Sequence, residues 1–507
     1  MAFAAEGPIS PAEMAVIERN AIALGVSLDA LMENAGRAVA EEAVRHLPSP
    51  PARVAVLAGT GNNGGDGTCA AHYLGQWGYA PEIWIVRAPA EIRSPAARRC
   101  FDRAALEFPV HVGVPRPVEL GEFALVIDAL LGTGQAGALR LPYRDAVHAA
   151  REAGAPILSV DEPTGLGADD ALRPRWTVAL HGLKTGMTAE RCGELVVRAI
   201  GIPPEAQAFT GPGEFLRYPA PSGAGGHPRP GRVVVIGGGP FAGAPALAAL
   251  AALRAGAERA TVLAPLPAAD RVQGFSPDLV VRAVGEDHFR PADLPTLEAG
   301  LAEMTVDAVV VGMGIGRAAP TVEAMGKLLP ALVARFPTVI DADALDAFAG
   351  PLPEEADRHP VVLTPNLTEF ARALGGEAFG SADERLEEAR RRAAARRVTL
   401  LVKGEEDLVT DARRSARNRH HPRALAVGGA GDLLAGVVGA LLAKGLPGVA
   451  AGRLASYWVG EAGYRAAARA GPGLTATDVL EELAPTLVAG LERVGRRADV
   501  ETGPESG

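Results

Sequence analysis

Two glycine-rich motifs, separated by most of the chain, constrain its fold more than any other feature. The first reads GTGNNGGDG over residues 59–67, and the second reads GGAGDLLAG over residues 428–436. Glycines free the backbone to bring its N–H groups close to an anion, and a helix that follows adds its positive end. Each motif lies within its own alternation of short apolar strands and helices. The sequence therefore predicts two active sites fused in one protein.

Composition limits the class of protein. The 507 residues are enough for two or more domains, each with a full hydrophobic core. A net charge of −10 disfavours nucleic-acid or anionic-membrane partners. The cysteines Cys69, Cys100 and Cys192 are scattered without a CxxC pair, which argues against a disulfide scaffold or a cysteine-based zinc site. Without a signal-peptide pattern or a membrane-length apolar run, we expect a cytoplasmic protein.

Lysine is rare, because nearly all of the 50 basic residues are arginine. Lysine occurs only at positions 184, 327, 403 and 444. Lys184 and Lys403 both fall inside motif-like segments, where a compact point charge differs in chemistry from a guanidinium. This retention weakly favours a role in a site, while chance survival of two lysines stays an open alternative.

The N-terminal half reads as a parallel α/β domain. Two amphipathic helices are expected over residues 11–46, and a helix over 66–75. The expected strands are 53–58, 82–86, 124–128 and 156–161. The loops at 59–67, 128–134 and 161–165 follow strands, so they should converge on one crevice beyond the carboxyl ends of the sheet. We predict a Rossmann-like three-layer αβα domain over residues 1–217.

The expected crevice is rich in oxygen and amide groups, from the side chains of Asn62, Asn63, Asp66, Asp128, Asp161 and Thr164. The motif is neither GxGxxG followed by a ribose-binding acid nor a P-loop. A glycine-rich turn can also be only a tight turn, and that alternative is weakened by three strand-end loops that carry acids. Oxygens from Asn63, Asp128 and Thr164 suit a hard cation.

Four segments of the first half, GNNGGDG, DALLGTG, DEPTG and TVALHGLKTG, closely resemble the NAD(P)H-hydrate epimerase domain over roughly residues 10–215. The resemblance implies potassium at Asn63, Asp128 and Thr164. It also implies substrate contacts at Asn62, Asn63, Gly64, Gly65, Asp66, Gly132, Thr133, Gly134, Gln135, Ala136, Gly137, Ala138 and Asp161. The common family form of the third segment is Asp-x-Pro-Ser-Gly; Thr164 keeps the hydroxyl, and the added charge of Glu162 has no assigned role.

Asp161 is the candidate catalytic residue of this half. Ionising the C6 hydroxyl of a hydrated nicotinamide ring gives a ring cation, which a nearby carboxylate could stabilise, or the same carboxyl could move protons. An aspartate that merely caps the next turn is the structural alternative.

Residues 218–230 (YPAPSGAGGHPRP) are dominated by proline and glycine and are expected to be a linker. A second α/β pattern begins at residue 231, with expected strands at 232–236, 307–311, 337–341, 361–363 and 400–403. The glycine turn after 236 is followed by no strand that ends in an acid, so a dinucleotide fingerprint is a weak match. We expect a second domain over 231–490 and a loose polar tail over 491–507.

The second glycine motif carries the most chemistry. Gly428, Gly429 and Gly431 allow the backbone to wrap an anion, and a helix is expected from Leu433. Asp432 lies between them, where a carboxylate beside phosphates is unfavourable unless it accepts a proton from a hydroxyl that attacks a phosphoryl group. An ordinary N-cap is the alternative. Lys403 and Gly404 would place a positive charge near the phosphates.

The second half resembles the ribokinase-like superfamily. Within it, GAPALAALAALRAGA, GMGIG, DADALD, TPNLTEF and GGAGDLLAG match the ADP/ATP-dependent NAD(P)H-hydrate dehydratase over roughly 231–485. The implied contacts with the hydrated nucleotide are Gly314, Asn366, Leu367, Thr368, Glu369, Phe370, Ala371, Arg372 and Asp432. Those with the adenine nucleotide are Lys403, Gly404, Glu405, Glu406, Asp407, Gly428, Gly429, Ala430 and Gly431. Many bacterial members carry His where Asn366 stands. Whether His420 or His421 touches a phosphate stays open.

Together the two resemblances imply repair of hydrated NAD(P)H. The first half would interconvert the R and S hydrates, and the second would phosphorylate the S hydroxyl with ADP or ATP and eliminate phosphate, aided by Mg²⁺. A vitamin or sugar kinase with a nucleotide-sensing first half is the alternative, because ribokinase-like kinases share the GxGD anion hole. A binding protein without turnover is the third hypothesis. We expect small-molecule substrates and a homo-oligomer; the preferred nucleotides are not determined.

Overall fold

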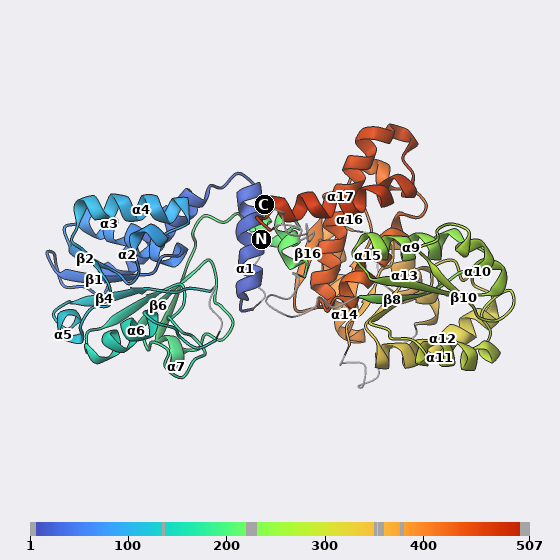
Figure 1. The fold of residues 1–507 in the computed structure, drawn as a ribbon, viewed down its shortest axis with the longest axis horizontal. Helices are drawn as coiled ribbons and strands as arrows, with labels where there is room; N and C mark the ends of the chain where they lie inside the picture. Colours follow the sequence, from blue (N-terminus) through green and yellow to red (C-terminus); the bar gives the residue numbers. More distant parts are fainter. Residues whose placement is uncertain are drawn as a thin grey trace, which may run out of the picture. The chain divides into compact units, whose positions relative to one another are not determined.

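The computed structural model describes residues 7–133, 137–219, 231–348, 352, 359–375 and 380–496. The chain divides into two compact units (Figure 1), Met1–Ala206 (unit 1) and Gln207–Gly507 (unit 2). Within the described ranges, no helix is both long and apolar enough to cross a membrane.

Unit 1 is built on a parallel sheet with the strand order β3-β2-β1-β4-β5-β6-β7. The strands are β1 Arg53–Ala58, β2 Ala80–Ile85, β3 Val110–Val112, β4 Leu125–Ala129, β5 Ile157–Val160, β6 Trp176–Leu180 and β7 Glu194–Arg198. The helices are α1 Pro11–Ala23, α2 Leu28–Val44, α3 Asn62–Gln76, α4 Pro95–Glu107, α5 Pro117–Leu120, α6 Tyr143–Glu152 and α7 Ala189–Cys192, with α8 Pro204–Ala208 at the boundary.

Alternation along the central strand of unit 1 creates its two apolar layers. Val54 and Val56 pack with α2, α3 and α4, while Ala55 and Leu57 pack with α5 and α6 on the opposite face. Figure 1 shows these two groups of helices on either side of the sheet. Helix α3 begins at Asn62, four residues before the expected start, because the glycine motif itself forms the first helical turn.

Unit 2 contains a sheet with the order β10-β9-β8-β11-β12-β13-β14-β15-β16, parallel except for the pairs β14–β15 and β15–β16. The strands are β8 Arg232–Ile236, β9 Arg259–Ala264, β10 Val280–Ala283, β11 Ala308–Val311, β12 Thr338–Ile340, β13 Val361–Leu363, β14 Thr399–Val402, β15 Asp407–Thr410 and β16 Ser415–Asn418. The α-helices are α9 Gly243–Arg254, α10 Leu266–Gln273, α11 Leu294–Ala302, α12 Ala319–Arg335, α13 Leu367–Leu374, α14 Ala382–Arg396, α15 Ala430–Ala443, α16 Gly448–Ala470 and α17 Ala476–Arg493.

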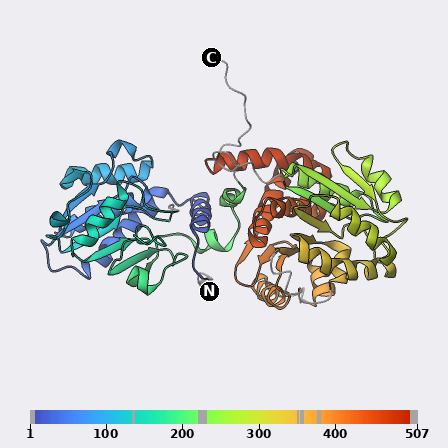
Figure 2. The same ribbon diagram turned by 60° about the horizontal axis from the view of Figure 1, so that its bottom comes forward.

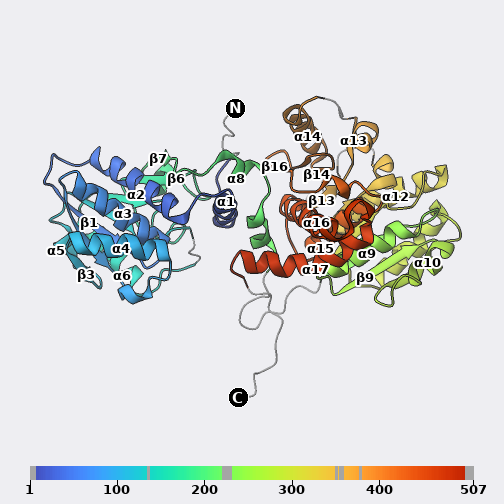
Figure 3. The same cartoon turned by 90° about the horizontal axis from the view of Figure 1, so that it is seen from above.

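Helices cover both faces of the second sheet. Val233, Val235 and Val310 face the layer of α9, α15, α16 and α17, which Figure 3 views from above. Val234 and Val309 face the layer of α11 to α14, drawn in yellow and orange and brought forward in Figure 2. Because both faces are buried, these strands are nearly continuous runs of valine and isoleucine instead of alternating sequences.

The boundary between the units lies earlier in the chain than residue 217, where the sequence pattern placed it. Phe209 forms a parallel β-bridge with Arg417 of β16, and Phe215 lies in the core of unit 2. Glu214 is fully buried and accepts hydrogen bonds from Arg453 on α16. These contacts attach residues 207–219 to unit 2. Of the expected linker, residues 220–230 lie outside the described residues.

The expected polar tail also begins later than residue 491. Helix α17 continues to Arg493, and Leu491 and Val494 are buried. Apolar contact thus keeps this part of the chain on the helical layer. Residues 497–507 lie outside the described residues.

Candidate active sites

The three strand-end loops of unit 1 converge on one cavity of about 770 Å³. This unit 1 cavity lies beyond the carboxyl ends of β1, β4, β5 and β6, as expected for a parallel sheet. Helices α1 and α2 supply its remaining wall. The expected substrate residues among its lining are Asn62, Asn63, Asp66, Gly132, Thr133, Ala138 and Asp161.

Several expected contact residues of unit 1 hold the loop in shape instead of lining the cavity. A Cβ on Gly64 would lie 1.9 Å from the carbonyl oxygen of Gly59, and one on Gly65 would lie 2.6 Å from Sδ of Met32. The first turn of α3 therefore packs at distances that only glycine permits. Gly137 has φ +87° and lines a neighbouring hollow, and Gly134, Gln135 and Ala136 lie outside the described residues.

Asp128 is the centre of a buried oxygen cluster at the end of β4. Its carboxylate accepts hydrogen bonds from Ser159 Oγ at 2.8 Å and from Thr164 Oγ1 at 2.6 Å. Burial raises the pKa of Asp128, and the hydrogen bonds from Thr164 and Ser159 oppose that rise. Thr164 is completely buried and also accepts a hydrogen bond from the N–H of Leu131 at 3.1 Å.

Asn63 has an unsatisfied side chain. Its amide oxygen and nitrogen are both buried and find no hydrogen-bond partner among the described residues. Gly132 passes close to it, since a Cβ there would lie 3.3 Å from Cγ of Asn63. A buried amide without partners costs about 1–3 kcal/mol. An ion that accepts the amide oxygen as a ligand would remove part of that cost.

Asp161 has a strained backbone conformation and a charged partner. Its φ is +64°, a left-handed conformation that non-glycine residues adopt rarely and often at functional sites. Its carboxylate forms an ion pair with Lys184, which is fully buried, and accepts a hydrogen bond from the N–H of Leu180 at 3.1 Å. The partners of Asp161 thus lie in and beyond β6, and these bonds differ from those of an aspartate that caps its own turn.

Further carboxyl groups surround this pair. Burial and the charge of Asp161 raise the pKa of Glu18 and raise that of Asp66 well above its ordinary value. The same causes raise the pKa of Glu162 to about 7. Glu18 was not anticipated from the sequence. The only available signal was one acid beside the buried face of an amphipathic helix.

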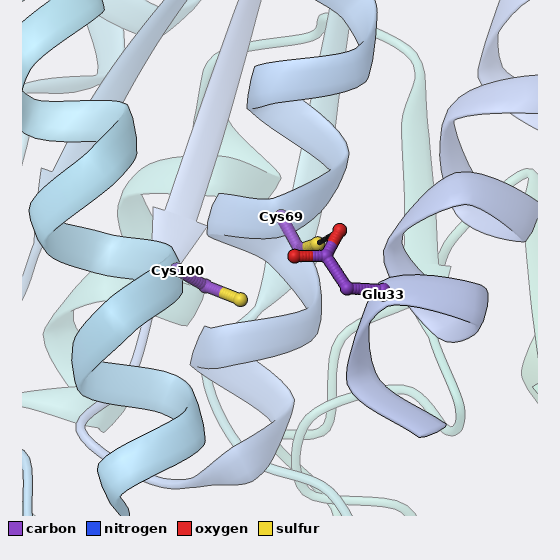
Figure 4. Close-up of side chains that lie close together, drawn as sticks. All are labelled: Glu33, Cys69 and Cys100. Carbon is purple, nitrogen blue, oxygen red and sulfur yellow. Dashed lines mark hydrogen bonds between the residues drawn. The ribbon is translucent and has the colours of Figure 1, made fainter. Parts of the chain in front are cut away.

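A second cluster in unit 1 brings together two of the scattered cysteines (Figure 4). The ligand atoms of Glu33 on α2, Cys69 on α3 and Cys100 on α4 lie within 4.8 Å of one another. Arg103 donates to Sγ of Cys69 at 3.3 Å and pairs with Glu33 at 2.8 Å. This guanidinium already supplies a positive charge, so the group is a poor cation site. The sequence spacing gave no sign that these cysteines meet.

The glycine motif of unit 2 lies at a larger cavity of about 1230 Å³, called here the unit 2 cavity. The expected nucleotide residues that line it are Lys403, Gly404, Glu405, Asp407, Ala430 and Gly431, together with Asn366. A loop that the sequence did not assign adds Arg419, His421 and Arg423. Its lining is thus a glycine turn at a helix N-terminus with cationic groups nearby, a combination suited to phosphates.

Lys403 occupies the position expected for a phosphate-binding cation. Its Nζ lies 2.9 Å from Oδ1 of Asp341, a buried residue at the end of β12. Burial opposes the charge, but attraction to Asp341 raises the pKa of Lys403. A Cβ on Gly431 would lie 3.0 Å from this Nζ, which places the ammonium against the first turn of α15. Asp341 belongs to the DADALD segment, and the sequence alone gave no sign that it pairs with Lys403.

Asp432 belongs to the first turn of α15 and is not its N-cap. The helix begins at Ala430, three residues earlier than expected, and the N-cap is Gly429 with φ +95° and no side-chain cap. Burial and then the charge of Asp341 raise the pKa of Asp432 to about 7, while Lys403 opposes the rise. Asp432 is not among the residues that line the unit 2 cavity, although Gly431 and Leu434 of the same helix are. A carboxyl group with a pKa near 7 at a helix N-terminus suits proton transfer.

Two of the expected contact residues of unit 2 are structural instead. Phe370 is 1% exposed and lies in the hydrophobic core, so its side chain does not face a ligand. Glu406 forms ion pairs with Arg417 and Arg419 and does not line the cavity. The direction of each side chain on its element decides which members of the two motifs are free to face the cavity.

The segment 366–372 forms the start of α13. Asn366 is its N-cap: its Oδ1 accepts from the N–H of Glu369 at 2.9 Å, and the Glu369 carboxylate accepts from the N–H of Asn366 at 2.8 Å. Arg372 pairs with Asp346 at 2.8 Å. Among the rest, Leu367 packs on the core, Ala371 is half-buried and Thr368 is exposed. Gly314, with φ +72°, lies against the carbonyl of Phe241.

The remaining nucleotide residues combine shape and support. Asp407 is buried and accepts hydrogen bonds from Ser456 Oγ at 2.5 Å and from the N–H of Gly404 at 3.2 Å. Gly428 has open space around its Cα. His420 stacks on Tyr457 and contacts Glu461 at 2.6 Å, whereas Nε2 of His421 is buried in the cavity wall with no partner among the described residues.

A glycine turn, a cavity and an acidic group in each of two α/β units define a two-site enzyme that handles nucleotides. The family described as "YjeF-related protein N-terminus" matches residues 28–186, and the "NAD(P)H-hydrate dehydratase" family matches residues 233–485. The chain belongs to the family of bifunctional NAD(P)H-hydrate repair enzymes. The enzyme of that name from Hyperthermus butylicus is 37% identical over 96% of this chain and 94% of its own. The one from Pyrobaculum aerophilum is 38% identical over 94% and 97%.

Among solved structures, an ADP/ATP-dependent NAD(P)H-hydrate dehydratase from Bacillus subtilis, co-crystallised with ATP and Mg²⁺, is 21% identical. It has a TM-score of 0.48 and covers 56% of this chain and 99% of its own. The family matches and the two sheets confirm the expected fold classes, a Rossmann-like three-layer αβα unit and a ribokinase-like α/β unit.

Proposed function

We propose that this protein repairs hydrated NAD(P)H in two steps. Unit 1 interconverts the R and S hydrates, and unit 2 dehydrates the S hydrate at the expense of ADP or ATP. The observation that carries the proposal is Asp432, a carboxyl group with a pKa near 7 in the first turn of α15, beside Lys403. Family membership and the two nucleotide-sized cavities support it.

In unit 2, Asp432 accepts the proton of the C6 hydroxyl, and the oxygen attacks the terminal phosphoryl group of the nucleotide. Phosphate then leaves from C6, because it is a much better leaving group than hydroxide, and the dihydropyridine ring is restored. Lys403 and the N-terminus of α15 stabilise the transferred charge. Bound Mg²⁺ would neutralise phosphate oxygens, and Glu369, an oxygen donor close enough to raise the pKa of Asp432, suits such a cation.

In unit 1, the Asp161 carboxylate is held by its ion pair with Lys184 and can stabilise the ring cation that forms when the C6 oxygen departs. Potassium is proposed at Asn63, Asp128 and Thr164. The unsatisfied amide of Asn63 and the buried oxygens of the other two fit a hard monovalent cation. When bound, the ion would supply a positive charge that orders the loops around the substrate.

The test combines purified protein, acid-hydrated NADH and either ADP or ATP, and follows the NADH absorbance band alongside Asp432→Asn. Wild type should restore NADH from both epimers and release phosphate, and the variant should restore none. If the variant restores the band as fast as wild type, the role of Asp432 is wrong. A stable phosphorylated product without NADH would support a small-molecule kinase instead.

We also propose that the protein acts in the cytoplasm and self-associates. The three cysteines are buried and free, which suits a reducing compartment. Large apolar side chains on and beside the edge strand β3 are exposed, namely Leu106, Val112 and Val118. Light scattering would test self-association, and a monomeric mass at micromolar concentration would contradict it.

A further inference from the structure

Helix α1 contributes an unassigned carboxyl group to the unit 1 cavity. Met14 and Glu18, one helical turn apart, both line the cavity with Asp66 and Asp161. Within the described residues, Glu18 forms no hydrogen bond or ion pair that would give it a structural role. Its side chain is half-buried and lines the same cavity as Asp161.

This helix is firmly held on unit 1. Ile9, just before α1, pairs with Lys184 as in a parallel sheet, with its N–H donating to Leu183 O at 2.8 Å. Ile17 is fully buried in an apolar cluster with Met14 and Ala206. The position of Glu18 is therefore set by packing beside the residue that holds Asp161. Helix α1 also precedes residues 28–186, so the matched family segment assigns nothing to Glu18.

The carboxyl groups of the cavity differ in their partners. Asp161 forms an ion pair with the buried Lys184, which suits electrostatic stabilisation more than proton transfer. Burial raises the pKa of Glu18, and the charge of Asp161 adds to the rise, while Lys184 and Arg19 oppose it. After burial and the charge of Asp161, the charge of Glu18 in turn raises the pKa of Asp66, the third acid that lines the cavity. One carboxyl paired with a cation and a second carboxyl without such a partner are an arrangement that suits the division of charge-stabilising and acid roles.

We propose that Glu18 is the acid–base residue of the epimerisation, an inference that rests on the proposed function of unit 1. Its carboxyl donates a proton to the C6 oxygen, the C6–O bond breaks, and water leaves with the bonding electron pair. The ring nitrogen lone pair forms the C6=N bond, and Asp161 balances the resulting cation. Water then adds to the opposite face of C6, and the proton that it loses returns to the Glu18 carboxylate. No oxidant or reductant is required.

The test measures conversion of the purified R hydrate to the S hydrate by chromatography, for wild type, Glu18→Gln, Glu18→Asp and the control Glu41→Gln. Glu41 lies on α2 at the surface, where its side chain is 48% exposed. We expect Glu18→Gln to lower kcat about 10²- to 10⁴-fold with KM within threefold. Glu18→Asp should recover part of the loss, and Glu41→Gln should match wild type. The wild-type kcat should fall as pH rises through the Glu18 pKa, and the residual rate of Glu18→Gln should lack that step.

Two results would overturn the inference: a Glu18→Gln variant as fast as wild type, or a loss seen only as a large rise in KM, which would indicate a binding or structural role. Dehydration of the S hydrate by unit 2 is measured in each preparation and should be unchanged. If wild type itself does not accelerate conversion above the spontaneous rate, the proposed function of unit 1 fails, and that result is distinct from either outcome for Glu18.

Discussion

The ammonium of Lys403 lies 2.9 Å from the Asp341 carboxylate, and this pair sits directly behind the first turn of α15. The two residues are 62 positions apart in the sequence. Asp341 follows β12 and Lys403 follows β14, and β13 lies between these two strands. Asp341 thus holds the lysine for which phosphate binding is proposed, and, together with burial, its charge also raises the pKa of Asp432. One buried carboxylate therefore acts on both residues.

Asp341→Asn should lower kcat/KM for dehydration about 100-fold, because Lys403 loses the partner that orients it. The acid limb of the rate profile should also move to lower pH, since removal of a nearby negative charge lowers the pKa of Asp432. Asp270→Asn, a loss of the same charge at an exposed position on α10, should leave both unchanged. Stopped assays of phosphate release over pH 5–9 measure both effects, and an unshifted limb would contradict the coupling.

Dehydration should depend on pH through Asp432 itself. Its pKa is raised from 3.8 to about 7, so the proton-accepting form is lost as pH falls through 7, and the rate should drop about tenfold per pH unit below that point. A carboxyl group whose pKa is raised by folding also destabilises the folded state at every pH above the ordinary pKa of that group. Asp432→Asn should therefore raise the free energy of unfolding at pH 8 by about 1–3 kcal/mol. Denaturant melts at pH 5 and 8 check the sign.

Lys184→Met should abolish epimerisation and destabilise unit 1 by about 1–3 kcal/mol, because it leaves the partly buried Asp161 carboxylate without its cation. Lys327→Met, at an exposed position on α12, is the matched control and should change little. The double variant Lys184→Met with Asp161→Leu should regain most of the stability but none of the activity. Equal melting temperatures for the single variant and wild type would refute a stabilising pair.

Epimerisation should require potassium through Asn63. At equal ionic strength, replacing KCl by tetramethylammonium chloride should slow R-to-S conversion at least tenfold, because the buried amide and the Asp128 cluster lose their ion. Asn63→Ala should be slow in both salts, with no response to potassium. A wild-type rate that is the same in the two salts would argue against an ion at this site.

Gly436→Ala should destabilise unit 2 by about 1–3 kcal/mol. Its Cβ would lie 2.1 Å from the carbonyl oxygen of Ala248, so α15 and α9 would have to move apart. Gly326→Ala on the exposed face of α12 is the control: no atom lies within 4 Å of its Cβ. That substitution should stabilise the helix by up to about 1 kcal/mol. Urea titration compares the two, and equal effects would contradict the packing argument.

Much of the site followed from strand-end logic. In unit 1, Asp128 and Asp161 each end or follow an apolar strand, and parallel strands present their carboxyl ends on one edge, so the loops that carry them were expected to meet. Lys403 follows a strand of unit 2 in the same way and lines the cavity of that unit. The helix starts were less predictable. Glycine has a low helix propensity, and α3 and α15 were expected to begin only at Asp66 and Leu433, after most of the glycines of their motifs. The glycines are nevertheless helical, because Gly64 and Gly65 must approach Gly59 and Met32 closely.

The contacts that sequence could not give are tertiary. Glu18 lines the same cavity as Asp161 because the segment that leads into α1 pairs with Lys184 through Ile9, and no spacing in the chain encodes that neighbour. The meeting of Cys69 with Cys100 likewise depends on how α3 packs against α4. Phe370 is the opposite case. The TPNLTEF motif led us to expect a ligand contact, but the position of Phe370 on α13 turns its side chain into the core.

The attachment of residues 207–219 to the second sheet has a practical consequence for anyone who wishes to express the two activities separately. A gene divided at the proline- and glycine-rich stretch would leave Phe215 and the Glu214 partner of Arg453 on the wrong fragment. Unit 2 would then lack a side chain of its own hydrophobic core. Division just before Gln207 keeps each hydrophobic interior complete.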